Sequence, residues 1–396
     1  MRQSSTMSFS AAGRSTSRII NQKAIADAIY HCVDGIPKVM LAKKLGLSKP
    51  AVSKNVADLI SMGLVEEKGE GEAGKTGGRK PLMLRFNHTY RYIGALDFSL
   101  KEPVCAIGDL YHNIIKLEKI HLGLDASAND KKQAVAQAFL SMLSQLGIPA
   151  EKLGIIVISH PGILSEGNEV RYVITQYQSW TGIGLKAYLE QNFKTRVLLE
   201  NNVRLSAIGE MNAGKNLQDL IYVDCGIGLG SSVIVNGELY DGTNRAAGEI
   251  GAFMLKDGQR AEEVLAMEGL LSRIAQLYKE SGRGETSFNF KKIIELSKSG
   301  DKEVNQAIQE TGRELGRIIY NCSILLDIPT VIFGGDYLRL GDVLFNAMEE
   351  MAAQFFLPFR PQIIRSSLMA TAGIYGGFVI GKEKIIAERL KIGGNL

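Results

Sequence analysis

The chain has 396 residues, which is enough for two or three domains with sizeable hydrophobic cores. Its hydrophobic content of 45% and charged content of 22% are typical of a soluble globular protein. No apolar run approaches the roughly 18 to 20 residues needed to cross a bilayer, so a membrane protein is not expected. The net charge of +4 is uneven: residues 1–90 hold 14 Lys and Arg against 7 Asp and Glu, a net +7, which leaves −3 for the rest. This asymmetry indicates a polyanion partner for the N-terminal region alone.

The cysteines and histidines indicate neither a disulfide framework nor a metal site. The four cysteines stand far apart with no CxxC pair, and all five histidines precede residue 161. A reducing, cytoplasmic location follows as the expectation. Residues 1–17 are rich in Ser, Thr and Arg and hold no acid, and we expect them to form a disordered tail.

Residues 18–88 have the pattern of a winged helix-turn-helix domain. Helical apolar spacing predicts one helix over residues 18–33 and a short second one over residues 39–45. Ser48 and Pro50 then open a third helix as its N-cap and first-turn residues. Residues 63–67 and 81–86 read as the two strands of a wing.

The predicted DNA contacts lie on the third helix, off its apolar stripe, or at the tip of the wing. They are Ser48, Lys49, Ser53, Lys54, Asn55, Arg79 and Lys80. Alone, such a helix face would equally suit the solvated side of a non-binding helical bundle. The wing that follows favours DNA binding.

Two later stretches of the chain echo each other. Residues 221–242 hold an apolar run ending in Asp224, a glycine-rich turn, a second apolar run and the turn Asn236-Gly237, which predicts a hairpin. Residues 92–113 repeat this pattern from Asp97, but bulky residues occupy the first turn. We therefore expect two related lobes, residues 89–215 and residues 216–396, the second with dimerisation helices.

Loops that follow predicted strands supply the candidate ligand contacts, because ligands bind at the carboxyl ends of strands in α/β sheets. These contacts are Gly162, Gln178, Trp180, Asn201, Asn202 and Glu249. A second set of backbone positions would form a residual nucleotide site: Gly226, Gly228, Gly230, Gly334 and Gly335. Simpler roles are open for each, since a lone Trp is commonly core, an amide after a strand caps a helix, and a glycine turn is often only a turn.

The order of these landmarks resembles the ROK family (repressors, open reading frames and sugar kinases), in particular its winged-helix regulators such as xylose-repressor-like proteins. The matching stretches are Pro161-Gly162, Glu200-Asn201, CGIGLGSSVIVNG at 225–237 and AAGEIG at 246–251. The resemblance implies an α/β chain, with the winged helix-turn-helix followed by a two-lobed actin-like ATPase, sugar-kinase-like fold.

The departures from the family pattern argue against catalysis and against a cofactor. Family kinases carry an aspartate base where this chain has Asn202, and an Asp-x-Gly-x-Thr turn where it has residues 97–101. An amide cannot accept the proton of a sugar hydroxyl. Ala252 stands at the family's histidine position, and residues 253–269 lack the zinc-binding cysteines of other members. We expect neither phosphotransfer, nor zinc, nor another metal or cofactor.

The leading hypothesis is a cytoplasmic transcriptional regulator, a repressor that acts as a homodimer or a dimer of dimers. It would bind double-stranded operator DNA and hold a sugar or sugar-derivative effector between its lobes, with no membrane partner. Two alternatives stay open. One is a sugar kinase with a DNA-binding domain, and the other is a ligand-independent regulator whose cleft is vestigial or docks a partner protein.

Overall fold

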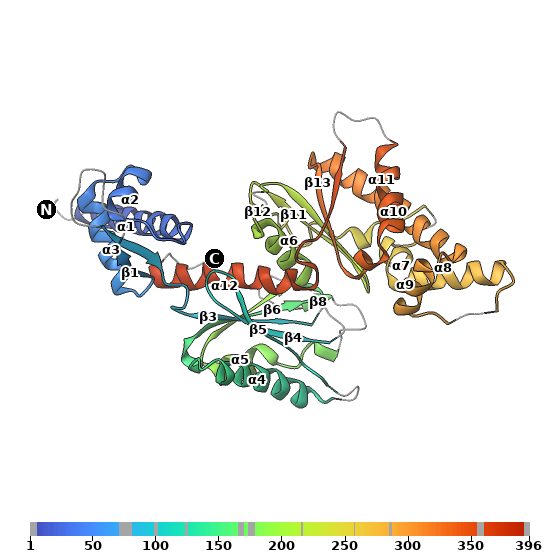
Figure 1. Ribbon diagram of the computed structural model, residues 1–396, viewed down its shortest axis with the longest axis horizontal. Coiled ribbons are helices and arrows are strands. Elements are labelled where there is room, and N and C mark those ends of the chain that lie inside the picture. Colours follow the sequence, from blue (N-terminus) through green and yellow to red (C-terminus); the bar gives the residue numbers. More distant parts are fainter. Residues whose placement is uncertain are drawn as a thin grey trace.

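The computed structural model describes residues 6–70, 81–98, 102–122, 126–164, 170–172, 179–214, 217–256, 258–284, 287–354 and 360–391. Figure 1 shows an N-terminal domain, two α/β lobes and a long helix, α12, that runs above the sheet of the first lobe and below the second lobe. Among the described residues, no helix has the length and apolarity that crossing a bilayer requires.

The N-terminal domain has the predicted winged helix-turn-helix arrangement. Its elements are α1 (Thr6–Tyr30), α2 (Lys38–Leu45), α3 (Lys49–Ser61), β1 (Val65–Glu70) and β2 (Leu82–Phe86). Gly46 ends α2 in a left-handed conformation, with φ of 65°. Two residues later the Ser48 hydroxyl accepts a hydrogen bond from the amide of Ala51 and begins α3. Helix α1 begins at Thr6, within the range of residues 1–17 for which a disordered tail is predicted, and residues 1–5 lie outside the described residues.

The first lobe is built on a five-stranded sheet in the order β5-β4-β3-β6-β9. Its strands are β3 (Tyr92–Asp97), β4 (Val104–Gly108), β5 (Ile114–Lys119), β6 (Leu153–His160) and β9 (Arg196–Asn201), with the short pair β7 (Ile163–Leu164) and β8 (Val170–Tyr172) beside it. Helices α4 (Ala128–Gln145) and α5 (Leu185–Phe193) cover one face of this sheet. Helix α6 (Asn202–Asn212) follows β9 directly and lies between the lobes, in contact with α12 and with strands of both sheets.

The second lobe repeats the first strand by strand, in the order β12-β11-β10-β13-β14. Its strands are β10 (Leu220–Cys225), β11 (Leu229–Val235), β12 (Glu238–Leu239), β13 (Thr330–Gly334) and β14 (Gln362–Arg365). Helices pack on one face in a large apolar cluster: α7 (Ala261–Leu265), α8 (Met267–Glu280), α9 (Phe290–Lys298), α10 (Lys302–Leu326) and α11 (Asp342–Ala353). In both sheets the first three strands are antiparallel and the last two parallel, which confirms the predicted echo.

Helix α12 (Ala372–Leu390) does not belong to the second lobe, where the predicted range of residues 216–396 placed it. It returns to the first lobe and covers the face of β3 and β6 opposite α4 and α5. Ile374 and Phe378 pack there in one apolar cluster with Ile93 and Val157. The first lobe is thus completed by a helix that follows the whole second lobe in the sequence.

Candidate functional site

A cavity of about 380 Å³ lies between the two lobes. The first lobe lines it with residues at the ends of β3, β6 and β9 and the start of α6: Asp97, Pro161, Gly162, Asn201, Asn202, Val203 and Ser206. The second lobe contributes mainly turns: Asp224, residues 226–231, Glu249, Glu262, Gly335, Asp336, Leu338 and Arg339. Met369, Ala370 and Gly373 close it at the start of α12. The carboxyl ends of strands from both sheets therefore face one shared space, as expected for α/β sheets.

Most of the predicted ligand and nucleotide positions line this cavity. They are Gly162, Asn201, Asn202, Glu249, Gly226, Gly228, Gly230 and Gly335. Gly334 is not among the lining residues, and a Cβ atom there would overlap the hydroxyl of Tyr222. Its glycine is explained by that close contact within the second lobe. Gln178 lies outside the described residues.

Trp180 is held in the first lobe and does not line the cavity, contrary to its predicted role as a ligand contact. Its ring stacks on Phe98 with centroids 4.8 Å apart and an interplanar angle of 18°. The Nζ atom of Lys131 lies 5.4 Å from the Trp180 ring centroid. The tryptophan therefore packs at the edge of the first-lobe core.

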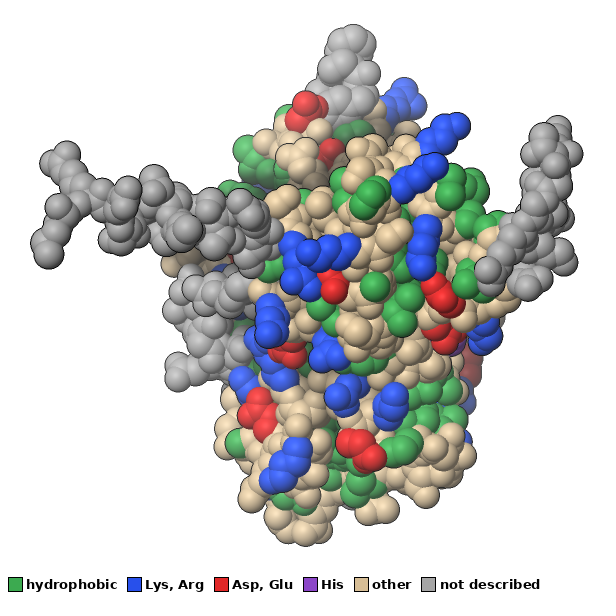
Figure 2. Space-filling model, turned by 90° about the vertical axis from the view of Figure 1, so that its left-hand side faces the viewer, with side chains coloured by type: hydrophobic (Ala, Val, Ile, Leu, Met, Phe, Trp, Pro, Cys, Tyr) green, Lys and Arg blue, Asp and Glu red, His purple; other side chains and the backbone are tan. Residues whose placement is uncertain are grey.

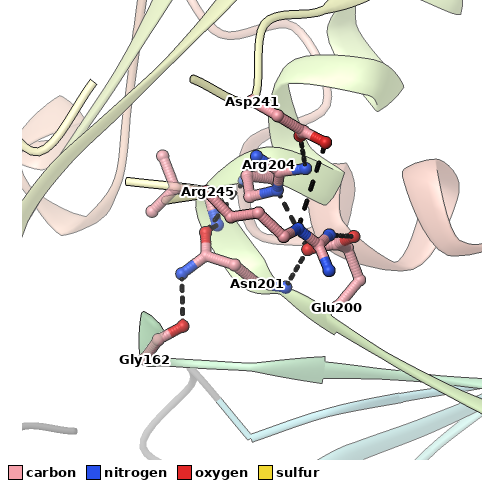
Figure 3. A network of polar contacts seen from close by, with 7 residues as sticks. Gly162, Glu200, Asn201, Arg204, Asp241 and Arg245 are labelled. Carbon is pink, nitrogen blue, oxygen red and sulfur yellow. Dashed lines mark hydrogen bonds and ion pairs between the residues drawn. The ribbon is translucent and has the colours of Figure 1, made fainter. Parts of the chain in front are cut away.

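Asn201 positions the cavity wall through both ends of its amide. Its Oδ1 atom accepts hydrogen bonds from the backbone amides of Val203 and Arg204, which caps α6. Its Nδ2 group donates to the carbonyl oxygen of Gly162 at 2.9 Å (Figure 3). Asn201 thus ties the loop after β6 to the start of α6, and Asn202 follows it on the cavity wall.

A network of ion pairs beside the cavity joins the two lobes (Figure 3). The carboxylate of Glu200 accepts from the Arg204 Nε group at 2.9 Å and from Arg245 at 2.8 Å. Arg204 also donates to Asp241, which lies with Arg245 in the loop after β12 of the second lobe. The Arg204 side chain is 9% exposed and that of Glu200 15%, so solvent screens their pair weakly.

Sequence reasoning missed this network. Glu200 and Arg204 are four residues apart at the start of a helix, a spacing that allows a pair to be guessed. Nothing local indicated the partners from the second lobe.

Carboxylates dominate the charge of the cavity. Asp97, Asp224, Glu249, Glu262 and Asp336 line it, and among its described lining residues Arg339 is the basic one. Burial, with smaller contributions from the charges of Asp336 and Asp97, raises the pKa of Asp224 to about 6. Burial and Glu262 likewise raise the pKa of Glu249. Such a site offers many hydrogen-bond acceptors to a hydroxyl-bearing ligand and repels a bare phosphate.

The segment where other family members are expected to hold zinc is a short hairpin here. The amide of Leu255 donates to Gln259 O at 2.8 Å and that of Ala261 to Phe253 O at 2.7 Å. Nowhere in the described ranges do three or more potential metal ligands gather. The absence of a zinc ion or other cofactor stays a prediction.

The predicted DNA-contacting face of α3 is exposed, with one exception. Ser48, Lys49, Ser53 and Lys54 are all exposed. Asn55 is only 6% exposed, and its side chain donates to the carbonyl oxygen of Ala51. The prediction that Asn55 lies off the apolar stripe is therefore wrong.

Basic side chains are frequent on the surface of this end of the molecule, as Figure 2 shows. The exposed lysines of the N-terminal domain are Lys23, Lys43, Lys44, Lys49, Lys54 and Lys68. Arg79 and Lys80 lie outside the described residues. The charge asymmetry of the sequence thus has a counterpart on the surface.

A family model described as the ROK family matches residues 93–384. The chain belongs to the ROK family. This ROK protein is 26% identical over 351 residues to the xylose repressor of Bacillus spizizenii, an alignment that covers 86% of this chain and 88% of the relative. It is 23% identical over 382 residues to the N-acetylglucosamine repressor of Escherichia coli O6:H1, an alignment that covers 91% of this chain and 92% of that relative.

Solved structures show the same fold for this ROK protein. A ROK family transcriptional regulator, a homologue of the E. coli MLC protein, aligns with a TM-score of 0.75 at 18% identity and covers 95% of this chain and 99% of its own. A ROK family glucokinase from Streptomyces griseus, in complex with glucose and AMPPNP, aligns with a TM-score of 0.60 at 20% identity and covers 74% and 99%. The regulator therefore matches nearly the whole chain, and the kinase only part of it.

Proposed function

We propose that this ROK protein is a cytoplasmic DNA-binding transcriptional repressor whose affinity for DNA is set by a sugar or sugar derivative bound between its lobes. The observation that carries this proposal is the pairing of a basic winged helix-turn-helix domain with a carboxylate-lined cavity between two sugar-kinase-like lobes. The names of the similar repressors support the same class of function.

The DNA contacts belong to α3 in this proposal. Lys49 and Lys54 are exposed and bind phosphates, while Ser48 and Ser53 meet the edge of the major groove. Asn55 is no longer included, since its amide is used within the helix. A homodimer would place two such helices about 34 Å apart, or a multiple of that distance, on a pseudo-palindromic operator.

The ligand is held by hydrogen bonds in a space where an amide occupies the position of the family's catalytic base. Glu249 and Asp224 accept hydrogen bonds from hydroxyl groups, and the Asn202 amide both donates and accepts. Asn202 stands where family kinases carry the aspartate that takes the proton of the sugar hydroxyl, and an amide cannot perform that step. Phe98, 2% exposed, lies in the first-lobe turn, residues 97–101, in which family kinases carry Asp-x-Gly-x-Thr. The chain therefore binds a sugar without phosphorylating it.

Selection of operator DNA from a random library with the full-length protein, followed by fluorescence anisotropy, tests the DNA half of the proposal. A Lys49→Ala/Lys54→Ala variant should bind more weakly, and the slope of log affinity against log salt should fall by about two. The control is Lys291→Ala/Lys298→Ala, which removes two exposed lysines from α9 in the second lobe. Equal effects of the two double variants, or no selection of DNA at all, would refute DNA binding through α3.

A kinase activity remains the second candidate because one observation favours it. The backbone turn at residues 226–230 and Gly335 line the cavity, so the second lobe retains a glycine-rich wall that suits a nucleotide. Release of ADP that depends on an added monosaccharide, measured with the purified protein, would establish that activity. Its absence across a monosaccharide panel that includes a sugar bound by calorimetry would exclude it.

A further inference from the structure

Helix α12 reaches from the interlobe cavity to the DNA-binding domain (Figure 1). Gly373, in its first turn, lines the cavity, and a Cβ atom there would lie 2.7 Å from the carboxylate of Asp97. Near its other end, the Arg389 Nε group donates to the carbonyl oxygen of Met62, the residue that ends α3. At a rise of about 1.5 Å per residue, the helix spans roughly 28 Å.

The far half of α12 belongs to an apolar cluster that extends from the first lobe into the DNA-binding domain. Ile385, Ile386 and Leu390 belong to one apolar cluster with Ile25 and Ile29 of α1. The Nζ atom of Lys382 also lies 4.1 Å from the ring centroid of Tyr30, the last residue of α1. The N-terminal domain therefore packs against α12, and a displacement of this helix would move the surface on which the domain rests.

Helices α6 and α12 touch backbone to backbone where they cross. A Cβ atom at Gly376 would overlap the carbonyl oxygen of Leu205, and one at Gly209 would overlap that of Ala372. No side chain separates the two helices at these points, so they cannot slide past each other without opening the contact.

The buried carboxylate of Glu210, at the end of α6, fixes the segment that leads into α12. It accepts hydrogen bonds from the hydroxyls of Ser366 and Ser367 and from the amide of Leu368. Helix α6 is thereby joined to α12 at its crossing and just ahead of its start.

Helix α6 also lines the cavity and contacts the second lobe. Asn202 and Ser206 line the cavity, and Arg204 is paired with Glu200 and with Asp241 of the second lobe. A change in the separation of the lobes, or a ligand that contacts Asn202, acts on α6 directly.

We infer that α6 and α12 move as one rigid unit, the α6–α12 unit, which transmits the state of the interlobe cavity to the DNA-binding domain. On α12 the surface on which that domain rests includes Lys382 against Tyr30 and Arg389 against Met62, and Tyr111 of the first lobe packs beside Tyr30. The biological meaning of this coupling rests on the proposed function, but the mechanical link itself requires neither operator nor effector to be known.

Hydrogen exchange of the full-length protein, measured by mass spectrometry, tests the link with a matched pair of variants. Gly376→Ala forces α12 away from the backbone of α6. Gly377→Ala adds the same methyl group one residue along, where its neighbours Val157 and Ala95 lie at ordinary contact distances of 3.5 and 3.6 Å. Amides at residues 58–64 and 22–32 should exchange roughly tenfold faster in Gly376→Ala than in Gly377→Ala, within the range typical of coupled sites.

The contradicting result is faster exchange within α6 and α12 of Gly376→Ala while residues 58–64 and 22–32 match Gly377→Ala. If Gly376→Ala does not fold, Arg389→Met tests the link from the other end, because coupling is reciprocal. It removes the contact with Met62, and exchange at residues 369–376 beside the cavity should then rise. Unchanged exchange there would refute the inference. Neither result depends on DNA or sugar binding, so the inference and the proposed function can fail separately.

Discussion

In the first lobe the turn after β3 begins with Phe98, whose ring is buried against Trp180, whereas in the second lobe the turn after β10 is formed by residues 226–230 and presents mostly backbone to the cavity. The two sheets have the same strand order, and each of these strands ends in or beside an aspartate, Asp97 or Asp224. A shared scaffold therefore supports two different turns, one packed by aromatic rings within the first lobe and one that presents glycine backbone to the cavity.

This difference teaches where each lobe tolerates change. The glycine turn of the second lobe depends on close contact between main chains, so an added methyl group should lower the free energy of unfolding there. The aromatic packing of the first lobe depends on filled volume, so removal of a ring should lower that free energy. Substitutions that add a methyl group to the glycine turn or remove a ring from the aromatic packing test these two requirements.

The largest effect is expected at Gly335 in the second lobe. Its φ of 83° is unfavourable for other residues, and a Cβ atom would overlap the carbonyl oxygen of Cys225. Gly335→Ala should lower the free energy of unfolding by about 4 kcal/mol in urea denaturation. The control is Gly341→Ala, which has φ of 65° and ψ of −150°, a conformation that is equally unfavourable for other residues, but no atom within 4 Å, and it should cost about 2 kcal/mol. Equal losses would mean that backbone conformation alone, and not the close contact, requires glycine.

Phe98→Ala tests the aromatic packing of Phe98 against Trp180 in the first lobe. Phe98 is 2% exposed, so its truncation should cost about 3 kcal/mol of unfolding free energy. Because Trp180 is the single tryptophan of the chain, its emission should shift to longer wavelength in the folded variant. Phe253→Ala, at a position 40% exposed, serves as the control and should change neither property much. An unshifted Trp180 emission in Phe98→Ala would contradict the described packing.

Asp224→Asn should stabilise the protein at neutral pH and have little effect in acid. Folding raises the pKa of this carboxyl from 3.8 to about 6, chiefly by burial. Its contribution to stability is therefore complete below pH 3.8 and is lost as the pH rises through about 6. The asparagine variant should be about 2 kcal/mol more stable than the wild type at pH 7.5, and the difference should vanish near pH 3.5.

The difference between the two proteins is the quantity to measure, because two buried histidines act in the opposite direction. Burial lowers the pKa of His112 and of His160 to about 4, so stability is lost as the pH falls below 6.5. That loss is common to both proteins and cancels. A pH-independent difference between wild type and Asp224→Asn in urea denaturation would refute the assignment to Asp224.

The smallest effect is expected at the second hairpin turn, where Asn236 has φ of 55° and Gly237 φ of 76°. Both are left-handed, as a type I′ turn between β11 and β12 requires. Asn236→Ala should cost about 1 kcal/mol, whereas Asn236→Gly should be neutral within a few tenths of a kcal/mol. Thermal unfolding of both variants provides the comparison, and a loss in Asn236→Gly as large as that in Asn236→Ala would show that the side chain matters more than the backbone.

The elements that the sequence predicted well are those with a strong local signal. The third helix of the N-terminal domain was predicted to begin where the structure shows it, since Ser48 caps its start and Pro50 lies in its first turn. The hairpin from Asp224 to Asn236 follows from its turns and apolar runs. Asn55 shows the limit of such local reasoning, because a polar residue next to an apolar stripe can still lie on the buried face of a helix.

What the sequence could not predict depends on partners far away along the chain. Nothing in the apolar residues of α12 indicates that this helix covers β3 and β6 of the first lobe and not the adjoining second lobe. By contrast, Asn202 and the glycines at 226, 228, 230 and 335 were predicted as ligand and nucleotide positions and do line the cavity, whereas Gly334 does not. The pairing of Arg204 with Asp241 required the position of the second lobe to be known.

The place of α12 also has a consequence for protein synthesis. Strands β3 and β6, which α12 covers, are translated before it. Their apolar face therefore stays uncovered until the entire second lobe has been synthesised. Nascent chains released before α12 is made would thus expose Ile93 and Val157 to chaperones and proteases, even though both residues are present in the chain. A premature stop ahead of the codon for Ala372 would therefore leave the first lobe incomplete.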